Sequence, residues 1–130
     1  PVSCAVALKT LEIYERDKVF QHAEKVGKYF QNSMKDILKE DYVGEVRGIG
    51  LIAGIELYKD PSNKIPFEEA GKAGKILSDT CQKNGLIVRP ILDTIALCPP
   101  LIISEKEIDE LTDKLKKSLQ EAKDEIMKSH

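Results

Sequence analysis

Apolar side chains recur every three or four residues over the first third of the chain, which is the spacing of one face of an α-helix. The pattern predicts a helix over residues 3–15 and a longer one after Asp17, whose carboxylate is suited to cap the first backbone N–H groups. The apolar stripe of the longer helix consists of Val19, Ala23, Val26, Phe30, Met34 and Ile37.

Two further helices are predicted in the second half of the chain. Pro66 suits the first turn of one, and Gly85 suits its end because glycine readily adopts the left-handed conformation that often follows a helix. The last helix opens with Ser104 and Glu107, which match a capping box. Its apolar stripe, which we expect to face the core, consists of Ile108, Leu111, Leu115, Leu119, Ala122 and Ile126.

Short apolar or alternating runs between the helices predict four strands, at residues 43–47, 51–57, 86–89 and 94–97. The element order is therefore helix, helix, strand, strand, helix, strand, strand, helix. This order predicts an α+β fold, with a small antiparallel sheet and helices on one face. In the second strand, one face is formed by Leu51, Ala53, Ile55 and Leu57.

The composition limits the class of protein. The chain has 130 residues, 42% hydrophobic and 32% charged, with a net charge of −2. It is the size of one domain. Because both signs of charge are interspersed, we expect no nucleic-acid or membrane partner. The three cysteines lack the spacing of a zinc site, so we expect no metal, and we interpret them as reduced, buried side chains of a cytoplasmic protein.

Arg89 is the candidate binding residue. It ends an apolar run and precedes Pro90, and a guanidinium at the end of a buried strand tends to point into a cleft. Its planar fork can donate two parallel hydrogen bonds to a carboxylate. The structural alternative is an ion pair with Asp93 or Glu56. Arg47 has a similar position before flexible glycines, and we expect it to form a structural salt bridge.

No complete catalytic set is visible, and we predict no catalytic residue in this chain. The glycines at 48, 50 and 54 have the wrong last spacing for a dinucleotide-binding loop, and they instead predict a close approach by another part of the structure. In a two-domain enzyme, the other domain is a candidate for that neighbour. The lysines mostly lie on polar helix faces, where nothing would lower their pKa for Schiff-base chemistry.

Residues 46–57 carry the pattern VRGxGLxxGIEL, and residues 84–101 carry the pattern GLIxR…DTIxLxPPL. Both stretches resemble those of the class III aminotransferases, which depend on pyridoxal 5'-phosphate. Residues 1–8 resemble the helix that links the two domains of these enzymes. The order and spacing of the three segments make the resemblance specific.

The resemblance implies that the chain is the C-terminal small domain of an ω-amino acid:pyruvate type aminotransferase. Residues 1–38 would be interdomain linker helices and residues 39–130 the small domain. The chain starts inside an expected helix and not at Met, so we expect a fragment whose large domain precedes residue 1. In the family that domain holds pyridoxal phosphate and carries the Schiff-base lysine, so we expect the isolated chain to be inactive.

The implied reaction moves an amino group from an ω-amino acid or amine to a keto acid such as pyruvate. In this subgroup, the arginine that matches Arg89 holds the substrate carboxylate and swings aside for substrates without one. The parent enzyme is expected to be a homodimer. We also expect the helix over residues 3–14 to expose an apolar surface to the missing domain.

Two alternatives stay open at this point. Diaminopelargonate, ornithine and γ-aminobutyrate transaminases share this domain and differ in how they hold the carboxylate. The same element order would also suit an autonomous α+β module that binds a ligand or regulates another protein.

Overall fold

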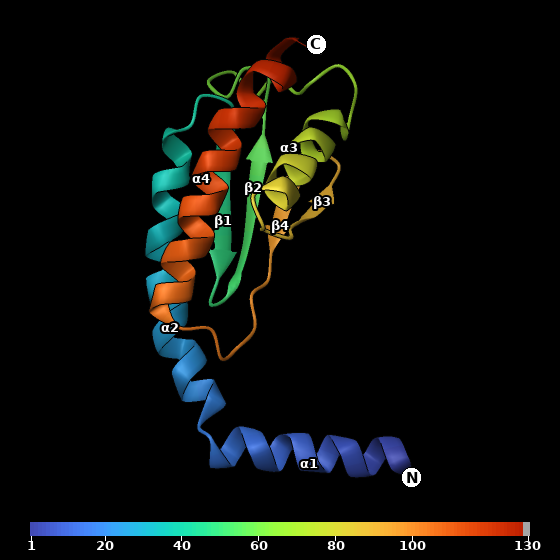
Figure 1. Cartoon of the computed structure of the whole chain (residues 1–130), viewed down its shortest axis with the longest axis vertical. Coiled ribbons are helices and arrows are strands. Elements are labelled where there is room, and N and C mark those ends of the chain that lie inside the picture. Colours follow the sequence, from blue (N-terminus) through green and yellow to red (C-terminus); the bar gives the residue numbers. More distant parts are fainter. Residues whose placement is uncertain (129–130) are drawn as a thin grey trace.

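A four-stranded antiparallel sheet with helices on one face forms the body of the molecule in a computed structural model that describes residues 1–128 (Figure 1). The α+β fold and the predicted element order are confirmed, with one short 3-10 helix, η1, added. In chain order the elements are α1 (Val2–Arg16), α2 (Val19–Met34), η1 (Lys35–Lys39), β1 (Val43–Ile49), β2 (Ile52–Leu57), α3 (Lys72–Lys83), β3 (Arg89–Ile91), β4 (Thr94–Leu97) and α4 (Glu105–Lys128).

The strands lie in the order β1-β2-β4-β3, so β2 and β4 are central and β3 is an edge strand. Ile55 of β2 pairs with Val46 of β1 on one side and with Ile95 of β4 on the other. A two-residue turn joins β1 to β2, and Gly50 opens it with a φ of 54°, a conformation that favours glycine. The first two strands thus form a hairpin whose tip is Gly50 and Leu51.

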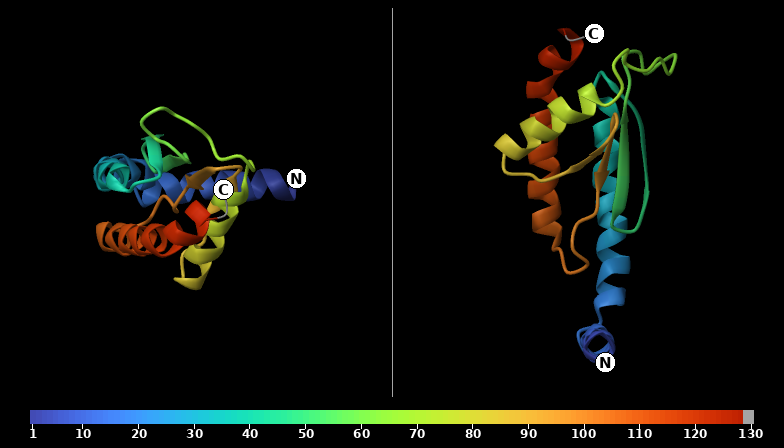
Figure 2. Two further views of the ribbon diagram at one scale, coloured as in Figure 1. Left: turned by 90° about the horizontal axis from the view of Figure 1, so that it is seen from above. Right: turned by 90° about the vertical axis from the view of Figure 1, so that its right-hand side faces the viewer.

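The core lies between the sheet and the helices. Figure 2 shows α3 and α4 on the same side of the sheet, and Figure 1 shows α2 running beside α4. Both predicted helix stripes face this core, with Ala23 and Leu111 only partly buried at its edge. The strand residues that complete it include Ala53, Ile55, Leu57, Ile95 and Leu97.

Helix α1 differs from the other helices because none of its residues is buried. It extends away from the body after a bend at Lys18, whose φ is 54° (Figure 1). The predicted exposed apolar surface is therefore present on this helix. Helix α2, in contrast, packs against α4 and contributes to the core. The division of the chain at residue 38 stays a prediction.

Two predicted helix starts are wrong. Asp17 does not cap α2, because its carboxylate pairs with Arg16 at 2.7 Å and Lys18 occupies the cap position without a side-chain cap. Helix α3 begins at Lys72 and not near Pro66. The reason is that an Asp60–Ile65 bridge folds the preceding loop, and the side chain of Phe67 is then buried in the core.

The third strand is also shorter than predicted. Leu86 donates its backbone N–H to the carbonyl oxygen of Cys81 at 2.9 Å, which completes the end of α3, and regular pairing starts only at Arg89. Gly85, with a φ of 76°, ends α3 in the predicted left-handed conformation. The predicted capping box is confirmed, since the N–H of Ser104 donates to Glu107 at 2.8 Å and the N–H of Glu107 donates back at 3.3 Å.

The prediction that the cysteines are reduced and buried is confirmed only in part. All three are free, and Cys81 is buried, but Cys4 and Cys98 are exposed. Cys4 lies on α1, against which no core forms, and Cys98 follows the end of β4. The expectation that a cysteine is buried holds only where the sequence places it on the core side of an element.

Candidate functional site

The candidate site lies on the face of the sheet that the helices leave uncovered. The strand register sets Arg47 opposite Gly54, Gly54 opposite Ala96, and Ala96 opposite Arg89. Because side chains alternate along a strand, this row faces away from the core-forming residues. We call these four residues the arginine row. It places two small residues between two arginines, on four different strands.

Arg89 is the first residue of β3 and is exposed, so the predicted position at the end of a strand is corrected to the start of one. Within residues 1–128 no carboxylate lies within ion-pair distance of its guanidinium. The two partners considered from the sequence are engaged elsewhere. Asp93 accepts two backbone N–H groups, and Glu56 pairs with Arg47. The guanidinium of Arg89 is thus available to a carboxylate from outside this part of the chain.

Arg47, at the other end of the row, forms the structural salt bridge that the sequence predicted. Its guanidinium lies 2.5 Å from Glu56 and 3.5 Å from Glu45, and the hydroxyl of Tyr58 donates to Glu56 at 2.8 Å. The hydrogen bond from Arg47, with a smaller contribution from Tyr58, lowers the pKa of Glu56, and the same pairing raises the pKa of Arg47. Arg47 is therefore held in place by this chain's own carboxylates.

The two central residues of the arginine row, Gly54 and Ala96, are small, so little side chain covers the strands between the two arginines. A methyl group added at Gly54 would meet only ordinary contacts, with Thr94 at 3.7 Å and the carbonyl oxygen of Arg47 at 3.9 Å. The fold itself therefore does not require glycine here, and the space above the strand is open. A shallow hollow of about 260 Å³ adjoins this face, lined by Glu56, Leu57, Tyr58, Pro66, Ala70, Leu92, Asp93 and Thr94.

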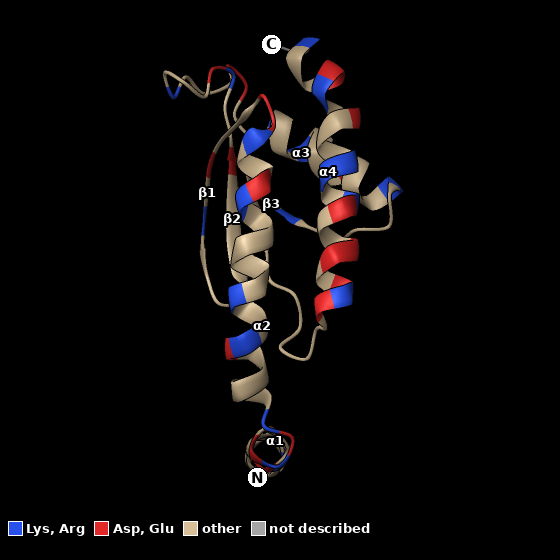
Figure 3. Cartoon of the chain, turned by 90° about the vertical axis from the view of Figure 1, so that its left-hand side faces the viewer, with Lys and Arg blue, Asp and Glu red and all other residues tan. Residues whose placement is uncertain are grey.

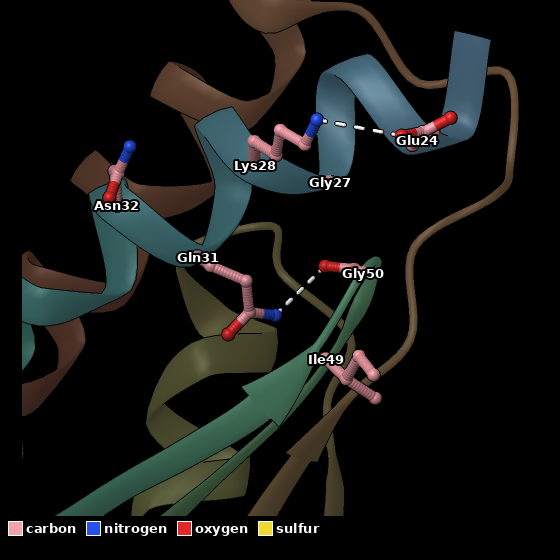
Figure 4. A pocket seen from close by; sticks show the side chains of 7 residues that line it. All are labelled: Glu24, Gly27, Lys28, Gln31, Asn32, Ile49 and Gly50. Carbon is pink, nitrogen blue, oxygen red and sulfur yellow. Dashed lines mark hydrogen bonds and ion pairs between the residues drawn. The ribbon is translucent and has the colours of Figure 1, made fainter. Parts of the chain in front are cut away.

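A larger hollow, of about 580 Å³, lies between α2 and the β1–β2 turn (Figure 4). Figure 4 shows Gln31 reaching from α2 to the carbonyl oxygen of Gly50, to which it donates at 2.8 Å, and Lys28 paired with Glu24 at 3.5 Å. The predicted close approach is confirmed at Gly50, because a methyl group on Gly27 would lie 2.8 Å from the Cα of Gly50, but not at Gly54, which has only ordinary contacts. The hollow lies beside this tight packing contact, and four of its lining residues already pair with each other, Gln31 with Gly50 and Lys28 with Glu24.

Comparison with known proteins decides the family. The model of the family described as "Aminotransferase class-III" matches residues 1–119. The chain belongs to the class III aminotransferases. The predicted resemblance is thus confirmed, and the matched stretch contains the whole arginine row.

Two curated relatives illustrate the family. A probable γ-aminobutyrate transaminase 3 of Oryza sativa subsp. indica, described as mitochondrial, is 36% identical over 126 residues, which are 97% of this chain and 25% of the relative. An adenosylmethionine-8-amino-7-oxononanoate aminotransferase of Methanocaldococcus jannaschii is 40% identical over 119 residues, 92% of this chain and 26% of the relative. The chain thus spans about a quarter of the length of these class III enzymes.

Solved structures agree with this fold. A structure titled "Transaminase with L-ala" superposes with a TM-score of 0.92 at 37% identity, over 97% of this chain and 29% of that one. The ω-transaminase of Pseudomonas jessenii in complex with PMP superposes with a TM-score of 0.91 at 33% identity, over 97% and 28%. Both comparisons place this chain in the fold of the pyridoxal-phosphate-dependent transaminases.

The class III cofactor, pyridoxal phosphate, does not fit a site made by residues 1–128 alone. A Schiff-base lysine needs an enclosed, apolar setting that lowers its pKa, and no lysine in the described part of the chain is buried.

Figure 3 shows basic and acidic residues interspersed along α2 and α4. The described residues also contain no cluster of three metal-ligating side chains and no helix long and apolar enough to cross a membrane.

One residue near the site has a role that sequence reasoning missed. Asp93 was considered only as an ion-pair partner of Arg89, but its carboxylate accepts the backbone N–H groups of Gly71 at 2.9 Å and Gly74 at 3.0 Å. These are among the first N–H groups of α3, which have no partner within a helix. No residue near Gly71 in the sequence signals this role, and the structure shows that α3 has no side-chain cap of its own.

Proposed function

We propose that this chain is the C-terminal small domain of a transaminase, and that Arg89 binds the carboxylate of the amino acid or keto acid substrate. The observation that supports this is a guanidinium exposed on the uncovered sheet face with no ion-pair partner within residues 1–128. A planar guanidinium holds a carboxylate by two parallel hydrogen bonds. The match to class III aminotransferases favours this reading over an autonomous ligand-binding module.

The proposed reaction moves an amino group from an ω-amino acid or amine to a keto acid such as pyruvate. Pyridoxal phosphate, when bound to the rest of the enzyme, supplies the chemistry that activates the amino group. This chain would contribute binding and orientation. Arg89 would fix the substrate's carboxylate, and the uncovered sheet face would form a wall that limits access of water. The isolated chain is expected to be inactive.

The substrate within this class stays open. The relatives include enzymes named as γ-aminobutyrate transaminase and as adenosylmethionine-8-amino-7-oxononanoate aminotransferase, and the structural neighbours include ω-transaminases. Ornithine transaminases remain a further possibility from the sequence resemblance. The homodimer and the cytoplasmic location are also proposals.

The test compares two amino donors in the enzyme that contains this chain together with its cofactor-binding domain. One donor is an ω-amino acid, and the other is a matched amine without the carboxylate. Arg89→Ala should lower kcat/KM for the ω-amino acid by about 10- to 150-fold, the value of a lost charged hydrogen bond, and change that for the amine little. Arg89→Lys should recover part of the loss because it restores the charge without the planar fork.

A matched control is Lys75→Ala, which removes a cation from the exposed side of α3, where Lys75 pairs with Asp79. It should affect neither donor. Equal losses for both donors in Arg89→Ala would show that Arg89 does not recognise the carboxylate.

A further inference from the structure

We infer that Asp93 is a positioning residue, which holds the strand that carries Arg89 against the start of α3. The inference rests on the proposed role of Arg89 and adds the means by which this guanidinium is set in place. Asp93 lies in the turn between β3 and β4, four residues after Arg89.

Strand β3 has few interactions of its own. It has three residues and lies at the edge of the sheet, so it pairs only with β4. Its middle residue is Pro90, which has no N–H to donate. Arg89, Pro90 and Ile91 are all exposed. A strand this short and this little buried needs other contacts to keep a fixed position.

Asp93 supplies those contacts at the turn. One carboxylate oxygen accepts the N–H of Gly71 at 2.9 Å and the other accepts the N–H of Gly74 at 3.0 Å. The backbone carbonyl of Asp93 also accepts the N–H of Leu57, at the end of β2, at 2.9 Å. The positive end of the helix dipole favours a carboxylate at this place. One residue thus joins the turn to both α3 and the central strand.

The other end of the segment is fixed to the same helix. After Gly85 ends α3, the N–H of Leu86 returns to the carbonyl oxygen of Cys81 at 2.9 Å. Residues 86–93 therefore run back along α3 between its two ends, with Arg89 between the attachments (Figure 1). Helix α3 is itself anchored in the core through Ala73, Leu77 and Cys81. These two attachments therefore fix the position of Arg89 relative to the core of the domain.

The turn also fits α3 without spare room. A side chain at Gly74 would collide with the carbonyl group of Leu92, which is backbone and cannot rotate away. Leu92 itself has a φ of 53°, a conformation that leucine rarely adopts without such surroundings. The carboxylate of Asp93 and the missing side chain of Gly74 therefore act on the same contact by different means, which gives two independent ways to disturb it.

The test uses the enzyme that contains this chain and the same two donors, one with and one without a carboxylate. Asp93→Asn removes one of the two acceptor oxygens and the charge. Gly74→Ala keeps Asp93 and favours the helix, but it pushes the turn away from α3. We expect each variant to raise KM for the carboxylate donor between about tenfold and about 100-fold, because a misplaced binding group loses that much. The values for the amine should stay within about twofold.

Asp79→Asn is the matched control, since Asp79 is an acidic residue on the exposed side of the same helix, paired with Lys75 at 2.7 Å. It should behave as the unmodified enzyme. If Asp93→Asn does not fold, as judged by its circular dichroism, Gly74→Ala decides the question. Proportional losses with both donors in the folded variants, or no loss, would overturn the positioning role.

Arg89→Ala, assayed in parallel, separates the two proposals. A selective loss in Arg89→Ala without one in Asp93→Asn and Gly74→Ala would leave the proposed function standing and reject the role of Asp93. No selective loss in Arg89→Ala would reject the proposed role of Arg89 and the positioning role with it. Selective losses in all three variants are the result we expect.

Discussion

The hydroxyl of Tyr42 donates a hydrogen bond of 2.7 Å to the carbonyl oxygen of Leu119, in the buried space where the chain enters β1 against α4. Burial is the main cause that raises the pKa of Tyr42 well above its usual value of 10, because a phenolate there would lose its water. The neutral hydroxyl is therefore the form that the folded state stabilises.

This relationship predicts how stability changes at alkaline pH. Since the pKa of Tyr42 is raised on folding, its contribution is complete below about pH 10, the ordinary tyrosine pKa, and is lost as pH rises above that value. Tyr42→Phe should lower the free energy of unfolding at pH 7 by about 1 kcal/mol and should weaken the fall above pH 10. Urea unfolding from pH 7 to 11 measures both. Tyr14→Phe, on α1, is the control and should leave both unchanged.

The close contact between Gly27 and Gly50 predicts that a glycine-to-alanine change in α2 destabilises the fold, which is the reverse of its usual effect in a helix. Replacing a glycine inside a helix by alanine normally stabilises the fold by about 1 kcal/mol. Here the new methyl group would lie 2.8 Å from the Cα of Gly50, which is backbone and cannot rotate aside, and overpacking costs about 1–3 kcal/mol. We expect Gly27→Ala to lower the free energy of unfolding by up to about 2 kcal/mol.

Gly54→Ala is the comparison, because its methyl group would meet only contacts of 3.7 Å and longer. Thermal unfolding of the two variants distinguishes them. A higher melting temperature for Gly27→Ala than for the unmodified chain would show that the approach of α2 to the hairpin tip is not tight.

The parts of the fold that the sequence predicted depend on neighbours in the chain. A helix stripe and the capping box at Ser104 are set by residues three and four positions apart, so their pattern is visible in the sequence. The start of α3 depends instead on Asp93, which is 22 residues away from Gly71. No residue near Gly71 in the sequence indicates that the carboxylate of Asp93 caps this helix. The same holds for β3, whose extent is set by its pairing with β4.

The candidate site likewise has features that the sequence predicted and features that depend on residues distant in the chain. The position of Arg47 before flexible glycines suggested a structural salt bridge without naming its partner, and the structure supplies Glu56 of the neighbouring strand. Whether Arg89 would pair with Asp93 or Glu56 depended on register and on what else those carboxylates bind, which no local pattern contains. Arg89 was selected partly through the family resemblance, and its role in substrate binding stays a prediction.

The capping box gives a prediction about the last helix. The N–H of Glu107 donates to the Ser104 hydroxyl at 3.3 Å, and Glu107 accepts the N–H of Ser104 at 2.8 Å. Ser104→Ala removes the cap and should lower the free energy of unfolding by about 1 kcal/mol. Ser33→Ala is a suitable control, because the Ser33 hydroxyl only bonds the carbonyl oxygen of Tyr29 within its own helix. Denaturant unfolding should show a loss for the first and little change for the second.

Because α1 is exposed, we predict that substitutions on its apolar side leave the stability of this chain nearly unchanged but weaken its binding to the rest of the enzyme. Leu8 and Leu11 are 69% and 54% exposed, so they contribute little to the core of this chain. Replacing both by glutamine should change its free energy of unfolding by less than about 0.5 kcal/mol per site, whereas Leu77→Ala, at a fully buried position, should cost about 2–5 kcal/mol. If α1 lies against the rest of a class III enzyme, the glutamine variant should bind a separately expressed cofactor-binding domain more weakly, as measured by calorimetry. Unchanged binding would mean that the apolar side of α1 has another partner, because an exposed apolar surface of this kind is seldom left in contact with water.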